Sequence, residues 1–188
     1  MSKPLFLFVG RSASGKTTAA NKLDGLGYKQ VQSYTTRKPR YDGETGHIFV
    51  SKDEFDNLGE LAAYTFYNGN EYGTTFKQLE ECSIYVIDVP GVETLLEKHK
   101  NKDRKICIVY FESSVTTRIE RMIDRGDSDT AIVCRLMQDE KYNWLAKIYE
   151  IVDEYDNISA DDILVVNAEM NAGDVLYDIL KYIKEQED

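Results

Sequence analysis

Cysteine, proline and positive charge are all scarce in this sequence of 188 residues. Its three cysteines, Cys82, Cys107 and Cys134, lie far apart and form no Cys-x-x-Cys pair. This spacing disfavours a zinc site or a disulfide framework and is typical of a reducing compartment, so we expect a cytoplasmic location. The formal net charge of −10 argues against nucleic acid as a partner, because general nucleic-acid binders are usually basic. A small anionic ligand is still compatible, since a local pocket can carry the opposite sign.

Long apolar runs are also missing. None approaches the roughly 20 residues that span a membrane, so we expect no membrane partner. The N-terminus has no basic segment followed by a long apolar one, and we therefore expect no secretory signal. The sequence shows no repeats or Pro/Ser linkers, and 42% of its residues are hydrophobic. These features predict one globular domain over residues 1–188.

Short apolar runs alternate with helical patterns along most of the chain. The apolar runs cover residues 4–9, 84–88, 106–111 and 163–166. Helical patterns cover residues 16–24, 114–124, about 131–154 and about 172–185. Continuous apolar runs are typical of strands buried on both faces of a parallel sheet. The alternation therefore predicts an α/β fold whose mostly parallel sheet is flanked by helices.

Residues 33–80 interrupt this alternation. They are rich in Thr, Tyr, Gly and Asn and contain short strand-like pieces, "HIFV" and "AAYTFY". We interpret them as a small inserted lobe on a core formed by residues 1–32 and 83–188.

The segment "GRSASGKT", residues 10–17, matches the phosphate-binding pattern GxxxxGK[ST] at every fixed position. Gly10 and Gly15 allow backbone angles and close approach that a Cβ would block. Successive N–H groups at a helix N-terminus can surround phosphate oxygens, Lys16 can reach the β- and γ-phosphates, and the Thr17 hydroxyl can bind Mg²⁺. The pattern predicts a nucleoside triphosphate site that comprises Gly10, Ser12, Ala13, Ser14, Gly15, Lys16, Thr17 and Thr18.

Two strings imitate the guanine-nucleotide motifs of GTPases, "DVPG" at 88–91 and "NKLD" at 21–24. The second string falls within the helix predicted after the P-loop, whereas GTPases carry it after a much later strand. We therefore disfavour a GTPase.

A second anion site is predicted in "SYTTRKPRYDGETG", residues 33–46. Arg37 and Arg40 are three residues apart, and guanidinium groups match phosphate geometry. A polar surface loop with incidental charges is the alternative. Two anion sites in one acidic domain suggest one site for a donor phosphate and one for an acceptor phosphate.

The sequence closely resembles the guanylate kinase family. The resemblance rests on the segments "GRSASGKTT", "SYTTRKPRYDGETG", "NEYGTT", "VIDVPGV", "RMIDRGDSDTAIVCRL" and "DILVVNAE". It implies a P-loop NTPase-type core with an inserted NMP-binding lobe and a lid at about 124–134. It also implies an ATP-dependent nucleoside monophosphate kinase that uses Mg²⁺ and phosphorylates GMP or a related (deoxy)nucleoside monophosphate. We expect a monomer or a homodimer.

The resemblance also implies roles for individual residues. His47 stands where the family has a tyrosine, and its ordinary pKa suggests pH-dependent acceptor binding; an ordinary polar position on a half-exposed strand is the alternative. Asp88 would orient the nucleophile or a Mg²⁺-bound water, with capping of the next turn as the alternative, and Thr74 would contact the base. The implied acceptor site comprises Ser33, Arg37, Arg40, His47, Tyr72, Thr74 and Asp88.

Arginines cluster in the region that resembles the lid. Arg118, Arg121 and Arg125 share one helix face by their spacing, and Arg135 follows on the next helix. The resemblance places Arg121, Arg125 and Arg135 near the transferred phosphoryl group, and a solvated basic face is the alternative. Asn167 resembles the position beside the donor adenine.

One position departs from the family pattern. The family reads guanine with a glutamate, and Ala63 occupies the matching position. A hydrogen bond to a charged group contributes about 1.5–3 kcal/mol, so its loss would weaken guanine selection roughly 10- to 150-fold. A relaxed or altered base preference is therefore a hypothesis. A non-catalytic binding module and a P-loop NTPase without an acceptor are the alternative functions.

Overall fold

The computed structural model describes residues 3–99, 104–141, 143–156 and 158–187 of the predicted domain at 1–188. Within these ranges, no helix combines the length and apolar composition needed to cross a bilayer.

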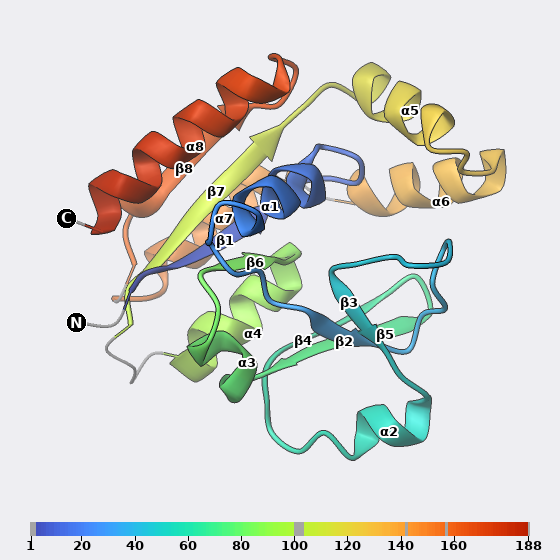
Figure 1. The fold of residues 1–188 in the computed structure, drawn as a ribbon, viewed down its shortest axis with the longest axis horizontal. Helices are drawn as coiled ribbons and strands as arrows, with labels where there is room; N and C mark the ends of the chain where they lie inside the picture. Colours follow the sequence, from blue (N-terminus) through green and yellow to red (C-terminus); the bar gives the residue numbers. More distant parts are fainter. Residues whose placement is uncertain (1–2, 100–103, 142, 157, 188) are drawn as a thin grey trace.

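A four-stranded parallel sheet forms the core (Figure 1). Its strands are β1 (Leu5–Val9), β6 (Ile84–Val86), β7 (Ile106–Glu112) and β8 (Ile163–Asn167), in the order β6-β1-β7-β8. The predicted α/β fold with a parallel sheet is confirmed. The predicted strand at 84–88 ends at Val86, because the chain turns there into α4 (Val89–His99).

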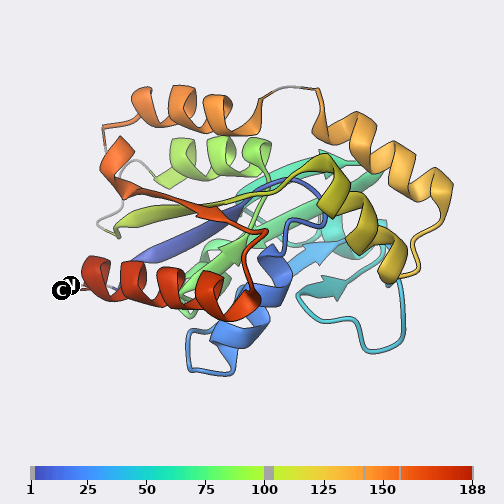
Figure 2. The same cartoon turned by 90° about the horizontal axis from the view of Figure 1, so that it is seen from above.

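Helices cover both faces of this sheet (Figure 2). The helices α1 (Lys16–Asp24) and α8 (Ala172–Glu187) cover one face, and α4 and α7 (Trp144–Asp153) cover the other. The sequence of strand β1 is apolar throughout because both faces of the strand are buried. Leu5, Leu7 and Val9 pack toward α4 and α7, while Phe6 and Phe8 pack toward α1 and α8.

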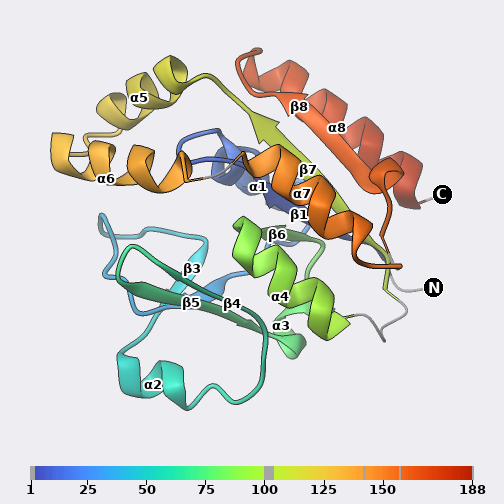
Figure 3. The same cartoon turned by 180° about the vertical axis from the view of Figure 1, so that it is seen from behind.

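A second sheet forms most of the predicted lobe and lies beside the core (Figures 1 and 3). Its strands are β2 (Ser33–Thr35), β3 (His47–Phe49), β4 (Leu61–Tyr67) and β5 (Asn70–Thr75), in the order β3-β2-β5-β4. Asn68 and Gly69 join β4 to β5 with positive φ angles of 48° and 76°, as a two-residue hairpin turn requires. The short helices α2 (Lys52–Asp56) and α3 (Phe76–Glu80) follow β3 and β5.

The single helical pattern expected at about 131–154 is wrong. The structure has two helices there, α6 (Asp129–Asp139) and α7, and residue 142 between them lies outside the described residues. The side chain of Asn143 accepts a hydrogen bond from the Ala146 amide and caps the start of α7. Helices α5 (Val115–Asp124) and α6 extend beyond the core sheet, on the side of the second sheet (Figures 1 and 3). The string at 21–24 lies within α1, as predicted.

Arg104 joins three segments near the start of the core sheet. Its guanidinium donates to the carbonyls of Lys3 (2.7 Å), Pro4 (3.2 Å), Cys82 (2.5 Å) and Leu79. Lys3 and Pro4 precede β1, Cys82 precedes β6, and Leu79 lies in the last turn of α3. One side chain therefore connects the lobe to the core.

We predict that Arg104→Ala lowers the free energy of unfolding by roughly 2–4 kcal/mol, because four backbone carbonyls, three of them in partly buried hydrogen bonds, lose a charged donor. Chemical denaturation would measure this change. Lys29→Ala is the control, because Lys29 pairs with Glu81 at 3.4 Å with both side chains 61% exposed; that change should be below about 1 kcal/mol. Equal effects in the two variants would contradict the structural role of Arg104.

Candidate active site

The P-loop connects the buried strand β1 to the start of α1. Gly10 has φ +152° and Gly15 has φ +100°, conformations that favour glycine. A Cβ at Gly10 would lie 2.6 Å from the carbonyl oxygen of Phe111. Among the described residues, no side chain caps α1 at Gly15. The helix therefore presents unpaired amide groups to the loop, as a phosphate site requires.

The ammonium group of Lys16 folds back over this loop. Its Nζ donates to the carbonyls of Gly10 (2.6 Å) and Arg11 (2.8 Å). Burial lowers the pKa of Lys16 to about 8, although the charges of Asp139 and Asp88 oppose this shift. A phosphate group would provide the counter-charge that this buried ammonium needs.

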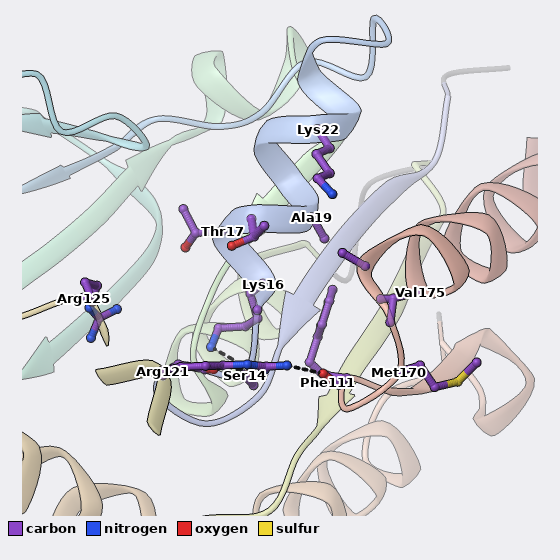
Figure 4. Close-up of a pocket in the computed structure, with 15 residues that line it drawn as sticks. Ser14, Lys16, Thr17, Ala19, Lys22, Phe111, Arg121, Arg125, Met170 and Val175 are labelled. Carbon is purple, nitrogen blue, oxygen red and sulfur yellow. Dashed lines mark hydrogen bonds between the residues drawn. The ribbon is translucent and has the colours of Figure 1, made fainter. Parts of the chain in front are cut away.

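A cavity of about 420 Å³ opens beside the P-loop, and we call it the P-loop cavity (Figure 4). Residues from the loop, α1, α5 and the segment after β8 line it. Arg121 borders the cavity and donates to the carbonyls of Ala13 (3.3 Å) and Ala168 (2.5 Å). Arg125 also lines it, and its guanidinium is paired with Asp127 at 2.5 Å.

The predicted triphosphate site maps largely onto this cavity. Six of its residues line it, namely Ala13, Ser14, Gly15, Lys16, Thr17 and Thr18, whereas Gly10 and Ser12 line a second cavity. The described residues contain no cluster of three or more His, Cys, Asp or Glu side chains that could hold a metal. The Thr17 hydroxyl on the cavity wall is an oxygen donor of the kind that Mg²⁺ prefers.

The second cavity, of about 170 Å³, lies between the P-loop and the second sheet, and we call it the lobe cavity. Ser33, Arg40, His47 and Tyr72 of the predicted acceptor site all line it. Ser33 Oγ lies 2.9 Å from His47 Nδ1, so the two side chains hydrogen-bond across neighbouring strands. Lys16 lines both cavities. The residue whose ammonium group contacts the P-loop carbonyls therefore borders both cavities.

Glu44, which the sequence analysis did not single out, organises the two predicted clamp arginines. Arg37 donates to both of its carboxylate oxygens (3.1 and 2.8 Å), and Arg40 lies 3.3 Å from it. Burial alone would raise the pKa of Glu44, but hydrogen bonds from Arg37 and the Arg40 backbone lower it. Arg37 is turned toward Glu44 and Phe49, and only Arg40 of the pair lines the lobe cavity. The spacing of Glu44, four positions after Arg40, was the sequence signal that could have predicted this ion pair.

The expectation that His47 titrates near neutral pH is wrong. Burial, together with the positive charge of Arg37, lowers the pKa of His47 to about 4. Without a bound anion, His47 is therefore neutral at physiological pH.

Asp88 follows β6 and lines the lobe cavity. Its Oδ1 accepts from the Gly91 amide and its Oδ2 accepts from the Thr65 hydroxyl, each at 3.0 Å. Burial raises the pKa of Asp88, while the hydrogen bonds partly oppose this shift. The side chain thus caps the first turn of α4 and also faces the cavity, so the two interpretations of Asp88 are compatible.

Three residues assigned to the predicted sites are placed differently from expectation. Thr74 is fully buried, lines neither cavity and donates to the hydroxyl of Tyr85, which lines the lobe cavity, at 2.8 Å. Asn167 Oδ1 caps the Glu169 amide at 3.0 Å beside the P-loop cavity rather than within its lining. Arg135 pairs with Asp127 at 3.3 Å and lines neither cavity.

Arg118 differs most from its predicted place on a shared face of α5. Its side chain is fully buried and pairs with Asp139 at 2.8 Å. Ala63, the position that matches the guanine-reading glutamate, is only 1% exposed and belongs to the hydrophobic core.

Comparison with known proteins identifies relatives of this chain, although no family model matches the sequence. The chain is 34% identical over 146 residues to the guanylate kinase of Geobacter metallireducens, and the match covers 70% of each chain. It is 27% identical over 181 residues to the guanylate kinase of Nitrosomonas europaea, covering 88% of this chain and 82% of the relative.

Two solved structures share the fold. The crystal structure of guanylate kinase from Anaplasma phagocytophilum superposes with a TM-score of 0.62 at 22% identity, covering 100% of this chain and 88% of that one. A gluconokinase from Sinorhizobium meliloti gives a TM-score of 0.54 at 13% identity, covering 99% and 94%.

We predict that affinity for a nucleoside triphosphate falls as the pH rises through about 8. Above this pH the free protein loses the Lys16 proton that the phosphates need, so binding must take up a proton. The dissociation constant should rise by up to about tenfold per pH unit above the pKa and stay nearly constant well below it. Calorimetric titration at several pH values between about 6 and about 9.5 would measure this dependence. Lys22→Met is the control, because Lys22 lines the same cavity. Its loss should preserve the pH dependence of the dissociation constant. A dissociation constant of the wild type that does not change with pH would refute the assignment to Lys16.

Proposed function

The chain belongs to the guanylate kinase family and is a nucleoside monophosphate kinase, and we propose that it transfers the γ-phosphoryl group of Mg-ATP to GMP or a related (deoxy)nucleoside monophosphate. The observation that carries the proposal is the position of Lys16, which lines both the P-loop cavity and the lobe cavity. A donor phosphate in the first cavity and an acceptor phosphate in the second would meet at one ammonium group.

On the donor side, the P-loop amides would hold the phosphates of ATP and Lys16 would neutralise their charge. Thr17 would offer its hydroxyl to Mg²⁺, and Asp88 would act on the ion through a water molecule. When bound, the ion would supply positive charge that offsets the negative charge of the phosphates. The adenine would lie toward Ala168 and Met170, which line the far part of the P-loop cavity, with Asn167 shaping the turn that carries them.

On the acceptor side, Ser33, Arg40, His47 and Tyr72 would contact the phosphate of the monophosphate. Arg37 would contribute through Glu44, since Glu44 pairs with both arginines and holds Arg40 toward the cavity. This arrangement prepares a forked donor before the substrate arrives, which reduces the ordering cost of binding.

Near the transferred group, Arg121 and Arg125 would stabilise developing negative charge, since both line the P-loop cavity. Arg135 would act indirectly by pairing with Asp127, which also holds Arg125. Phosphoryl transfer needs mainly positioning and charge neutralisation, so these residues supply what the reaction requires.

The acceptor base is less constrained than the reaction. Ala63 is buried in the core and offers no hydrogen-bonding group, and a glutamate introduced there would be placed among hydrophobic residues. A panel of acceptors is therefore a sharper test of base preference than Ala63→Glu. A non-catalytic module is disfavoured by the intact Lys16 and Thr17, and an NTPase without an acceptor by the lobe cavity.

We predict that ATP consumption requires an added nucleoside monophosphate and that more than one base or sugar is accepted. A coupled assay with a panel of NMPs and dNMPs, and with no acceptor, would measure this. Consumption without an acceptor would indicate an NTPase, and none under any condition would indicate a binding module. Strict use of GMP would show that guanine is read by residues other than the one at position 63.

We also predict that Arg40→Ala raises the acceptor KM by roughly 10- to 150-fold, as expected for losing a charged hydrogen bond. The ATP KM should change by less than about threefold, because Arg40 lines only the lobe cavity. Steady-state kinetics with each substrate varied would separate the two. Lys38→Ala is the matched control, because Lys38 is an exposed cation in the same segment; equal effects of Arg40→Ala on both KM values would contradict the two-cavity assignment.

A further inference from the structure

A buried ion pair lies directly behind the P-loop. Arg118 of α5 and Asp139 at the end of α6 are both fully buried, and Arg118 Nη1 lies 2.8 Å from Asp139 Oδ2. Arg118 Nη2 lies 3.1 Å from Glu140 Oε1, and the side chain of Glu140 is 53% exposed. Neither Arg118 nor Asp139 was assigned a role by the sequence analysis or by the family resemblance.

Asp139 contacts the P-loop itself. Its Oδ2 accepts from the Ser12 amide at 2.8 Å and its Oδ1 accepts from the Ser12 hydroxyl at 3.2 Å. The carbonyls of Gly10 and Arg11, which precede Ser12, are the acceptors for Lys16 Nζ. Asp139 therefore holds the part of the loop that positions the ammonium group of Lys16.

The backbone of Asp139 is held as well. Its carbonyl accepts from Trp144 Nε1 at 2.9 Å and from Arg11 Nε at 3.4 Å. The side chain and backbone of one residue thus connect the P-loop, the end of α6 and the start of α7.

Helix α5 contacts neighbouring P-loop residues through two arginines. Arg118 reaches Ser12 by way of Asp139, and Arg121 donates directly to the carbonyl of Ala13. The two arginines are one helical turn apart. The helix that carries Arg121 and Arg125 is therefore held in register with the loop.

Stability alone is a weak reason for this arrangement. Burying two charges costs desolvation free energy that their attraction roughly offsets, and apolar replacements of similar volume are often at least as stable. A buried pair placed between the loop and an arginine-bearing helix has instead the geometry of a positioning device.

We propose that Asp139 and Arg118 are positioning residues that fix the conformation of the P-loop and the register of α5 for phosphoryl transfer. This inference rests on the proposed function and deepens it. Neither residue takes part in the chemistry, and both act through Ser12 and Lys16.

Asp139→Asn is the most direct test, because asparagine keeps the shape and one acceptor oxygen but removes the charge. We expect kcat to fall by roughly 10- to 100-fold, as a small displacement of catalytic groups can cause. The ATP dissociation constant should rise by about 3- to 10-fold, since the loop that binds its phosphates loses an anchor. The acceptor KM should change less than the ATP dissociation constant, because Asp139 borders the lobe cavity but its side chain bonds Ser12 and Arg118 rather than the clamp residues. All measurements are made at a temperature where melting curves show each variant to be folded.

Glu140→Gln is the matched control, since it removes the exposed partner of the same arginine and should change kcat and melting temperature little. Arg118→Lys keeps the charge and removes the guanidinium fork, and we expect the same pattern of changes in a weaker form. If Asp139→Asn lowers only the melting temperature, with kcat and ATP affinity of the wild type, the pair is structural and the inference is overturned.

A measurement on the unmodified protein keeps the test independent of folding in the variants. The Ser12 amide should exchange its hydrogen slowly in the absence of nucleotide, because it is bonded to Asp139, and rapid exchange would overturn the inference. Failure of the proposed function is distinguishable. If the wild type phosphorylates no monophosphate, that function fails, while the ATP affinity of Asp139→Asn and the Ser12 exchange rate still report whether the pair positions the loop.

Discussion

One buried ammonium group, that of Lys16, sets the requirements for the rest of the site. Burial makes its charged form costly, as its lowered pKa shows, and the loop carbonyls of Gly10 and Arg11 compensate only in part. The strongly twisted loop, with positive φ at Gly10 and Gly15, brings those carbonyls and the amides of α1 around a single point. A phosphate group at that point would satisfy the amides and the ammonium together, so the loop is organised around an anion that must be supplied from outside.

Several arginines around this point are each paired with a carboxylate, whereas Arg121 donates to the backbone carbonyls of Ala13 and Ala168. Glu44 pairs with Arg37 and Arg40, and Asp127 pairs with Arg125 and Arg135. Asp139 pairs with Arg118 in the same manner, but in full burial. A chain of net charge −10 can therefore keep a dense set of guanidinium groups ordered without a bound anion. The acids direct each cation, and a substrate phosphate gains preorganised donors rather than flexible side chains.

Much of the fold could be predicted from the sequence because its signals are local. Continuous apolar runs such as "LFLFV" are typical of strands buried on both faces of a sheet, and the P-loop pattern specifies its own backbone. The partners of the charged residues could not be predicted. Spacing places Arg118 on a helix face, but only the packing of α5 against the end of α6 shows that it is buried with Asp139. Likewise, the low pKa of His47 depends on burial and on Arg37, which are tertiary features.

The same distinction explains why the reaction is better defined than the acceptor base. Phosphate recognition depends on backbone amides and on charges that a short motif carries, so it survives changes elsewhere. Base recognition depends on single side chains at particular places on a sheet. Here Ala63 lies opposite Thr74 in the register of β4 and β5, and the Thr74 hydroxyl is donated to Tyr85. Both side chains are buried, and neither lines the lobe cavity. Among the residues that do line that cavity, Asp88 and Thr65 form a hydrogen-bonded pair.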